Sequence, residues 1–430
     1  MATSRTLAAL VLAFVPAIAE AQVPPPGPYR ANLPAGHPAI DYHRRQSDDI
    51  VAQLASQLEA ASTTLEHDER FGYLPALLER LDVPVDSQAL VFSQTSLLSN
   101  HIGPRQPRAL YFNETVAIGF VPGAALLEVM AFVPEDGARF YTFGRSPDGA
   151  PRVARPNVCL QCHQAAATLG VPGPYVGSVS TTATGRPDFT LGTVVTSHDT
   201  PFEQRWGGWY VTGEHGDQRH RGNAVARDPS TPAGFVDPAN QNLTTLTRFI
   251  DPDDYPVPTS DLVALMTLEH QAHLLNLFTR AGWEARIAEH DGLLDASEKE
   301  DRAALVEEIV RYMLFADEAP LSAPIRGVST FTETFSAGGP RDRLGRSLRE
   351  FDLETSLFRY RLSYLIYSPL LDNLPSDVRN TIYARLLTTL TTDHASSRHL
   401  TSEERWTILE IVRDTKPHLP AAWHQELGPP

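Results

Sequence analysis

The stretch Cys159-Leu160-Gln161-Cys162-His163 follows the pattern C-x-x-C-H, and its two cysteines are the only ones among the 430 residues. The thiols of such a pair can each form a thioether with a vinyl group of haem, and the histidine that follows then offers its imidazole to the iron. The pattern therefore predicts one covalently bound haem c. Cys159 and Cys162 would be the attachment residues, and His163 the proximal iron ligand.

Three other uses of this cysteine pair fit the sequence less well. A zinc site takes about four ligands, and the sequence has no second cysteine pair. A thioredoxin-like redox pair needs a strand followed by a helix, whereas Pro156 and Asn157 precede the motif in a turn-rich run. A disulfide between Cys159 and Cys162 would close a very short loop and stabilise the fold little.

The first 21 residues have the features of a cleaved export signal. Arg5 gives a positive start, an almost unbroken apolar run extends from Leu7 to Ala19, and Ala19-Glu20-Ala21 matches an A-x-A cleavage site. The apolar run is shorter than the roughly 20 residues that a membrane span needs, and no later run reaches that length. We expect a mature chain that starts near Gln22, without a membrane span, in the periplasm or secreted. Bacteria attach haem c outside the cytoplasm, so the signal and the motif support each other.

Length and charge limit the remaining possibilities. A chain of 430 residues predicts two or three domains. The formal net charge of −16 argues against nucleic acids and anionic membrane surfaces as partners.

The residues after the expected export signal divide into a proline-rich segment and a segment with helical periodicity. Six prolines fall within residues 22–40, which predicts an extended tether. Residues 41–84 are expected to form helices, one from Asp41 to about Ala61 and a second from Tyr73 to Leu81. In the first, Ile50, Leu54 and Leu58 share one face.

Residues 85–235 are expected to form a β-rich haem c domain. Short β-branched or aromatic runs alternate with turn residues, which is the spacing of an antiparallel meander. The runs in question are 109–112, 116–120, 126–133 and 139–143, with further strands at 190–196 and 209–212.

Residues 258–430 are expected to form a helical C-terminal domain. A long buried helix from Ser260 to about His290 is predicted by its nearly continuous apolar start, and capping boxes open further helices at Ser297 and Thr401. The fold class is therefore α+β: an antiparallel β-rich mono-haem c domain, preceded by short helices and followed by an all-helical region.

The sixth ligand of the iron would decide the chemistry, and three histidines are candidates. His220, His198 and His215 all lie in the glycine-rich part of the β-rich domain. Arg219 and Arg221 flank His220 and are possible partners of the haem propionates. An iron without any protein ligand in this position also stays open.

Met130 and a set of polar residues on one expected helix could bind a metal, but each could also have a purely structural role. Met130 is a fourth candidate for the sixth ligand of the iron, but it lies within an expected strand, where core packing is the simpler role. Glu269, His270 and His273 lie on one expected helix and could be half of a metal site, or histidines with a structural role only.

Four pieces of the chain resemble a group of exported bacterial proteins that are described only as cytochrome c domain-containing. The pieces are Pro107–Asn113, the C-L-Q-C-H run, Arg205–Gly213 and Arg341–Phe351. The resemblance covers most of the mature chain. It implies export and covalent haem, but no substrate.

The expected meander that ends in C-x-x-C-H is also similar to β-sheet haem proteins of the cytochrome c-prime-beta type and their hydroxylamine-oxidising relatives. That likeness implies a fold other than the small all-helical cytochromes, which take a methionine ligand downstream of the motif. Here the next methionine is Met266. The hydroxylamine-oxidising relatives carry a lysine cross-link to the haem, whereas Lys299 and Lys416 both fall in the expected helical region.

These features favour a periplasmic mono-haem c-type cytochrome that transfers electrons to an unknown redox partner protein. An open iron site would instead give a peroxidase-like haem oxidoreductase with a small-molecule substrate. A gas or redox sensor is a third possibility, although no signalling domain accompanies the motif. Whether the chain is an enzyme stays open at this point.

Overall fold

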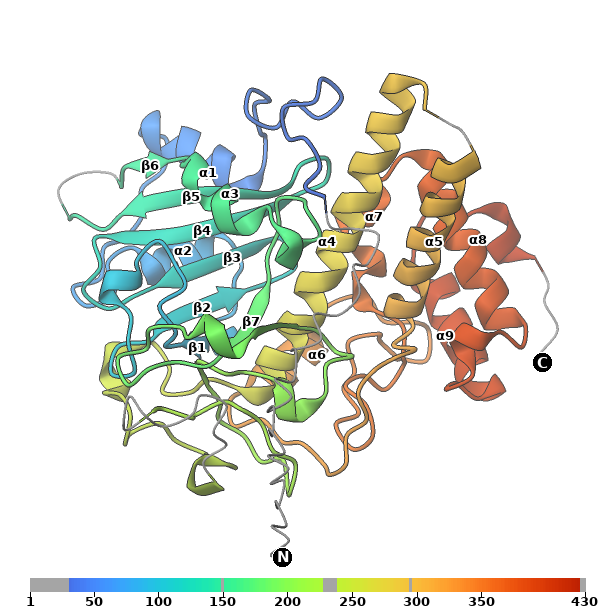
Figure 1. The fold of residues 1–430 in the computed structure, drawn as a ribbon. Helices are drawn as coiled ribbons and strands as arrows, with labels where there is room; N and C mark the ends of the chain where they lie inside the picture. Colours follow the sequence, from blue (N-terminus) through green and yellow to red (C-terminus); the bar gives the residue numbers. More distant parts are fainter. Residues whose placement is uncertain (1–30, 148–150, 227–237, 294–295, 426–430) are drawn as a thin grey trace, which may run out of the picture.

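A computed structural model describes residues 31–147, 151–226, 238–293 and 296–425 (Figure 1). The fold is α+β, as predicted: one seven-stranded antiparallel sheet lies between short N-terminal helices and a block of longer C-terminal helices. The expected export signal, residues 1–21, lies outside the described residues. None of the described helices is both long and apolar enough to cross a membrane.

Residues 31–40 differ from the extended tether that the prolines predict. Ala35, Ile40 and Tyr42 are buried in a small cluster with Val171 and Trp283. The Tyr42 hydroxyl donates to the carbonyl oxygen of Ala138 at 2.7 Å. The apolar side chains of this segment pack against Val171 and Trp283, so the segment belongs to the core.

Two short helices follow, close to the predicted positions. Helix α1 spans Ile50–Glu59 and α2 spans Leu74–Arg80. Helix α1 starts later than predicted because the Asp49 carboxylate caps it, accepting hydrogen bonds from the backbone N–H groups of Val51 and Ala52. Its buried face contains Val51, Leu54 and Leu58, while Ile50 is 42% exposed.

The sheet has the strand order β6-β5-β4-β3-β2-β1-β9 and every neighbouring pair is antiparallel. Its strands are β1 (Ala89–Val91), β2 (Arg108–Phe112), β3 (Val116–Phe120), β4 (Leu126–Val133), β5 (Gly137–Gly144), β6 (Val153–Ala154) and β9 (Trp209–Tyr210). The predicted four-strand meander is confirmed as β2 to β5. The sequence pattern did not indicate that β9 returns to pair with β1.

A separate hairpin consists of β7 (Val176–Val179) and β8 (Thr193–Thr196). The strand predicted from Thr190 starts at Thr193 instead, because residues 189–191 form a 3-10 turn that Asp188 caps.

Each face of the sheet has its own core, since successive residues of a strand point to opposite sides. Ile118 and Phe120 of β3 and Val129 of β4 pack with α1 and α2. Phe112 of β2 and Phe132 of β4 belong to a second core that they share with the C-terminal helices. The sheet therefore separates the N-terminal helices from the rest of the molecule.

The C-terminal region is helical, as predicted, with irregular segments between its helices. The helices are α4 (Leu262–Asp291), α5 (Ala296–Met313), α6 (Phe331–Ala337), α7 (Pro369–Asp372), α8 (Ser376–Thr391) and α9 (Ser402–Thr415). The capping box predicted at Thr401 is present, with Glu404 as its second member.

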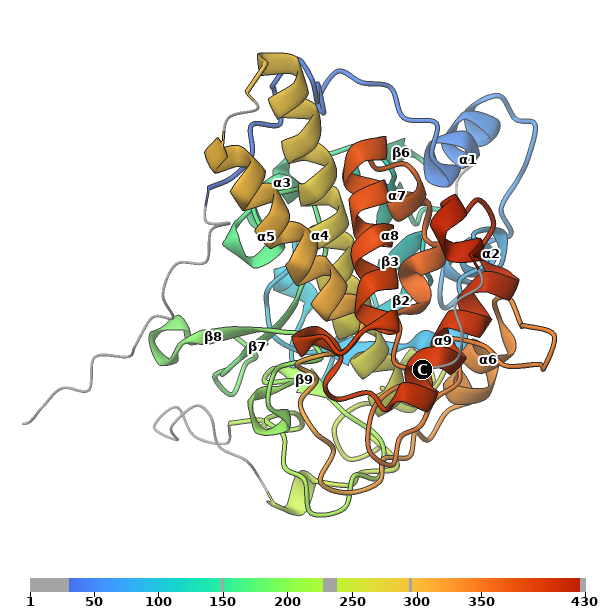
Figure 2. The same ribbon diagram turned by 90° about the vertical axis from the view of Figure 1, so that its right-hand side faces the viewer.

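Helix α4 is buried on nearly all sides because it lies between two layers. Asp261 caps its start and Gly292, in the left-handed conformation, ends it. Figure 2 shows α5 and α8 in front of α4, with the sheet behind it. One continuous core contains residues of the sheet, of α4 and of the later helices, so the core does not stop at the boundary expected near residue 258.

Candidate functional site

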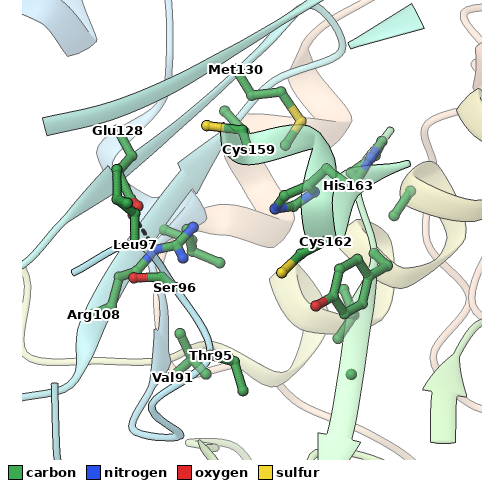
Figure 3. Close-up of a pocket in the computed structure, with 18 of the residues that line it drawn as sticks. Val91, Thr95, Ser96, Leu97, Arg108, Glu128, Met130, Cys159, Cys162 and His163 are labelled. Atoms are coloured by element: carbon green, nitrogen blue, oxygen red, sulfur yellow. Dashed lines mark ion pairs between the residues drawn. The ribbon is translucent and has the colours of Figure 1, made fainter. Parts of the chain in front are cut away.

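A cavity of about 730 Å³ lies between the sheet, the hairpin β7–β8 and helix α4 (Figure 3). This volume is within the range of small-molecule and cofactor sites. Cys159, Cys162 and His163 all line it. The rest of the cavity wall comes from strands β2 to β5, from the hairpin β7–β8, and from Leu268, Gln271 and Ala272 of α4.

The motif forms a single helical turn at the edge of this cavity. Residues Asn157–Cys159 form a 3-10 turn that leads into α3 (Leu160–His163). Cys159 is half-buried, Cys162 is exposed, and both thiols are free. Burial raises the pKa of the Cys159 thiol, and the nearby negative charge of Glu128 adds to the effect.

The ring of His163 is oriented by the loop that follows the motif. Its Nδ1 lies 2.9 Å from the carbonyl oxygen of Gly173, so this nitrogen carries the proton and Nε2 is left with its lone pair. The rings of Phe140 and Tyr175 pack at centroid distances of 5.0 and 5.4 Å. Loss of hydration lowers the pKa of His163 to about 4, which keeps the imidazole neutral at pH 7. A neutral imidazole with a free Nε2 is the form that binds a metal.

The walls of the cavity fit a large apolar group. Leu97, Val158 and Phe189 line it and are nevertheless 50%, 43% and 67% exposed. Exposed apolar side chains around one concave site mark a surface that a ligand covers. Arg186 also lines the cavity and makes no ion pair within the described part of the chain, so it is free to meet an acidic group. Two thiols, one imidazole and this lining together fit haem c.

One charged pair stands out on the wall across the cavity from His163 (Figure 3). Arg108 of β2 and Glu128 of β4 have Nε and Oε2 at 3.2 Å, with both side chains mostly buried. Between them on β3 is Gly119, which pairs with Glu128 in the sheet register. A side chain at residue 119 would occupy the space in which the two charged groups meet.

The three histidines proposed as sixth ligands do not line the cavity. His198 turns toward α4, where its Nδ1 lies 2.8 Å from Nδ1 of His270. His215 has its Nδ1 2.7 Å from the carbonyl oxygen of Gln218. His220 is buried beside the rings of Trp206 and His215.

The two arginines proposed as propionate partners also lie elsewhere. Arg221 donates a hydrogen bond to the Ser180 hydroxyl, and Arg219 is exposed to solvent. Strand β9 does bring Trp209 to the cavity. After it the chain turns away, because the Asn223 side chain bonds to the backbone of Val211 and closes the loop on itself.

Cavity residues that the sequence analysis did not single out are Arg108, Glu128, Arg186 and Gln271. A signal for the first two existed. Glu128 is a charged residue within the expected strand 126–133, and Arg108 directly precedes the expected run 109–112. Each shares a face with apolar residues of its strand. Met130, a candidate sixth ligand for which core packing was the simpler expectation, lines the cavity near Cys159 (Figure 3).

Helix α4 carries a second set of buried polar groups, away from the cavity. Glu269 pairs with Arg205 at 3.2 Å, and Nε2 of His270 lies 2.7 Å from the Ser363 hydroxyl. Burial raises the pKa of Glu269 to about 7, although the charge of Arg205 opposes this shift, and burial lowers the pKa of His270 to about 3.

Among the residues that the structure describes, these α4 residues are not part of a metal cluster. Within the described ranges, the single group of three potential ligands close enough for one ion is His37, His290 and Asp291, at the surface. The half-site hypothesis for Glu269, His270 and His273 thus finds no completing ligands in the part of the chain that the structure describes.

Comparison with known proteins gives no match: no family model, no curated protein and no solved structure is similar to this chain.

Proposed function

We propose that the chain is an exported mono-haem c-type cytochrome that transfers electrons. Cys159 and Cys162 would hold the porphyrin through thioethers, and His163 would bind the iron through Nε2. The observation that carries this proposal is the meeting of all three motif side chains in one cavity, with Nδ1 of His163 occupied by Gly173. A bound haem would supply reversible one-electron chemistry.

The residues around the site support this role in two ways. With haem bound, the apolar walls would keep water from it, and exclusion of water is one of the factors that set a haem potential. Cys162 is exposed at the cavity edge. An exposed attachment residue would place one edge of the haem at the surface, where a redox partner protein can approach.

The test is expression of the full chain, with its leader, in a host that matures c-type cytochromes. We expect a coloured protein whose intact mass exceeds that of the processed polypeptide by one haem. The double variant Cys159→Ser/Cys162→Ser should be colourless, with no added mass. A colourless wild-type protein without added mass would contradict the proposal.

A second function, a haem oxidoreductase with an open iron site, is favoured by the placement of the candidate histidines. None of them lines the cavity, and the wall across from His163 carries a charged pair. The visible spectrum of the ferric protein separates the two functions. A six-coordinate low-spin spectrum that cyanide leaves unchanged supports electron transfer, whereas immediate cyanide binding supports the open site.

A further inference from the structure

The pair Arg108 and Glu128 is an unusual feature of the cavity wall. On the same face of their strands the neighbouring positions are apolar: Leu110 and Phe112 on β2, Met130 on β4. Charged groups are costly to withdraw from water. A partly buried ion pair of this kind contributes little to stability, since the loss of hydration offsets the attraction.

The two side chains form an ion pair but no hydrogen bond with each other. Arg108 Nε and Glu128 Oε2 are buried and 3.2 Å apart, but neither atom has a hydrogen-bond partner within the described residues. A guanidinium has five N–H donors and a carboxylate about four acceptor positions. The pair therefore offers unused donors and acceptors at the cavity.

Gly119 makes this arrangement possible. A Cβ atom there would lie 2.9 Å from Arg108 Nε and 3.2 Å from Glu128 Oε2. Its backbone has an ordinary strand conformation, so a larger residue would be excluded by the side chains above it, not by strain. The strand register keeps the space between Arg108 and Glu128 free of other side chains.

We propose that Arg108 and Glu128 form the polar end of a ligand site on the haem face opposite His163. The inference rests on the proposed haem, and within it on the open iron site. The ligand class is a small protic molecule of the hydroperoxide type, which has a proton to give and oxygen lone pairs to share. The Glu128 carboxylate accepts the proton, and Arg108 donates hydrogen bonds to the negative charge that remains on the ligand.

Two probes separate these roles on the ferric holoprotein. Hydrogen cyanide must lose a proton when it binds, so its association rate reports the acceptor. Fluoride ion has no proton to lose, so its dissociation constant reports the donor. We expect Glu128→Gln to slow cyanide association by roughly tenfold or more without weakening fluoride. We expect Arg108→Gln to weaken fluoride by about tenfold.

Gly119→Ala is the sharpest variant, because it keeps both charges and moves them apart. It should slow cyanide association and weaken fluoride together. Arg108→Lys, which keeps the charge and loses the planar fork, serves if Arg108→Gln does not fold. Glu410→Gln is the matched control, since it neutralises a carboxylate that pairs with Arg346 at 2.8 Å, away from the cavity.

Intact mass and thermal unfolding are measured for every variant first. Absence of haem in the wild type would refute the proposed function itself. Haem present, with cyanide and fluoride binding in all cavity variants equal to those of Glu410→Gln, would overturn this inference alone. A wild-type iron that binds neither probe would overturn it as well.

Discussion

The Nδ1 atom of His163 and the carbonyl oxygen of Gly173 lie 2.9 Å apart, which ties the last residue of the motif to the loop behind it. Helix α4 supports this loop in turn, because the Asn276 side chain donates a hydrogen bond to the carbonyl oxygen of Pro174 at 2.8 Å. The imidazole is thus positioned by a residue more than a hundred positions further along the chain.

Replacement of Gly173 tests this support. A Cβ atom at Gly173 would lie 1.8 Å from Oδ1 of Asn276, so Gly173→Ala must displace the loop or the helix. We expect the free energy of unfolding to fall by about 1–3 kcal/mol. If the chain carries the proposed haem, its midpoint potential should also change, while the haem stays attached. Gly36→Ala is the control, since nothing lies within 4 Å of its added Cβ. Equal behaviour of the two variants would contradict the role of Gly173.

The N-terminal segment should contribute to stability. Ile40 is 1% exposed and packs in the cluster with Trp283. Ile40→Ala should lower the free energy of unfolding by about 2–5 kcal/mol, measured by denaturant titration. Leu344→Ala, at a residue that is 68% exposed, should leave it nearly unchanged. A similar small effect for both would show that residues 31–40 are dispensable to the core.

The buried pair of Arg205 and Glu269 should respond unequally to loss of each partner. Arg205 also donates to the carbonyl oxygens of Thr200 and His198, both at 2.8 Å. Arg205→Gln leaves the carboxylate without its charged partner and should cost about 3–5 kcal/mol of unfolding free energy. Glu269→Gln should cost less, because the guanidinium keeps its two carbonyl partners. Chemical denaturation at pH 8 compares the two, and equal losses would be inconsistent with this account.

Acid should destabilise the protein partly through His270. Burial lowers the pKa of His270 from 6.5 to about 3 in the folded state, so below pH 6.5 the unfolded chain binds a proton that the folded chain does not. Stability should therefore fall as the pH decreases from 6.5 toward 3. His270→Gln should flatten this part of the stability curve, whereas His101→Gln, at an exposed position, should not. An unchanged slope in His270→Gln would rule the histidine out.

Local patterns in the sequence predicted the elements well and their distant neighbours poorly. The meander β2 to β5 follows from β-branched and aromatic runs bounded by turn residues, and helix α4 from its apolar run. The pairing of β9 with β1 joins residues far apart in sequence, and no local pattern specifies it. Which residues line the cavity depends on such pairings between distant segments. For that reason Cys159, Cys162 and His163 were found from their motif, while Arg108 and Glu128 were not found.

The histidines that were proposed as sixth ligands, but do not line the cavity, illustrate the same limit. His198 and His220 lie in glycine-rich loops, and a loop histidine reads the same in sequence whether it turns to a cavity or to a helix. The choice is made by partners such as His270 and Trp206, which only the packed chain brings close.

The position of helix α4 has a consequence for the order in which the protein assembles. Leu268, Gln271 and Ala272 complete the cavity wall, but they are synthesised long after the C-x-x-C-H turn. If the chain binds haem as we propose, a chain in which α4 has not yet docked would leave the cavity beside the two thiols open on that side. Helix α4 would then pack against a haem that is already attached. The proposed cofactor would in that case help α4 to dock on the sheet.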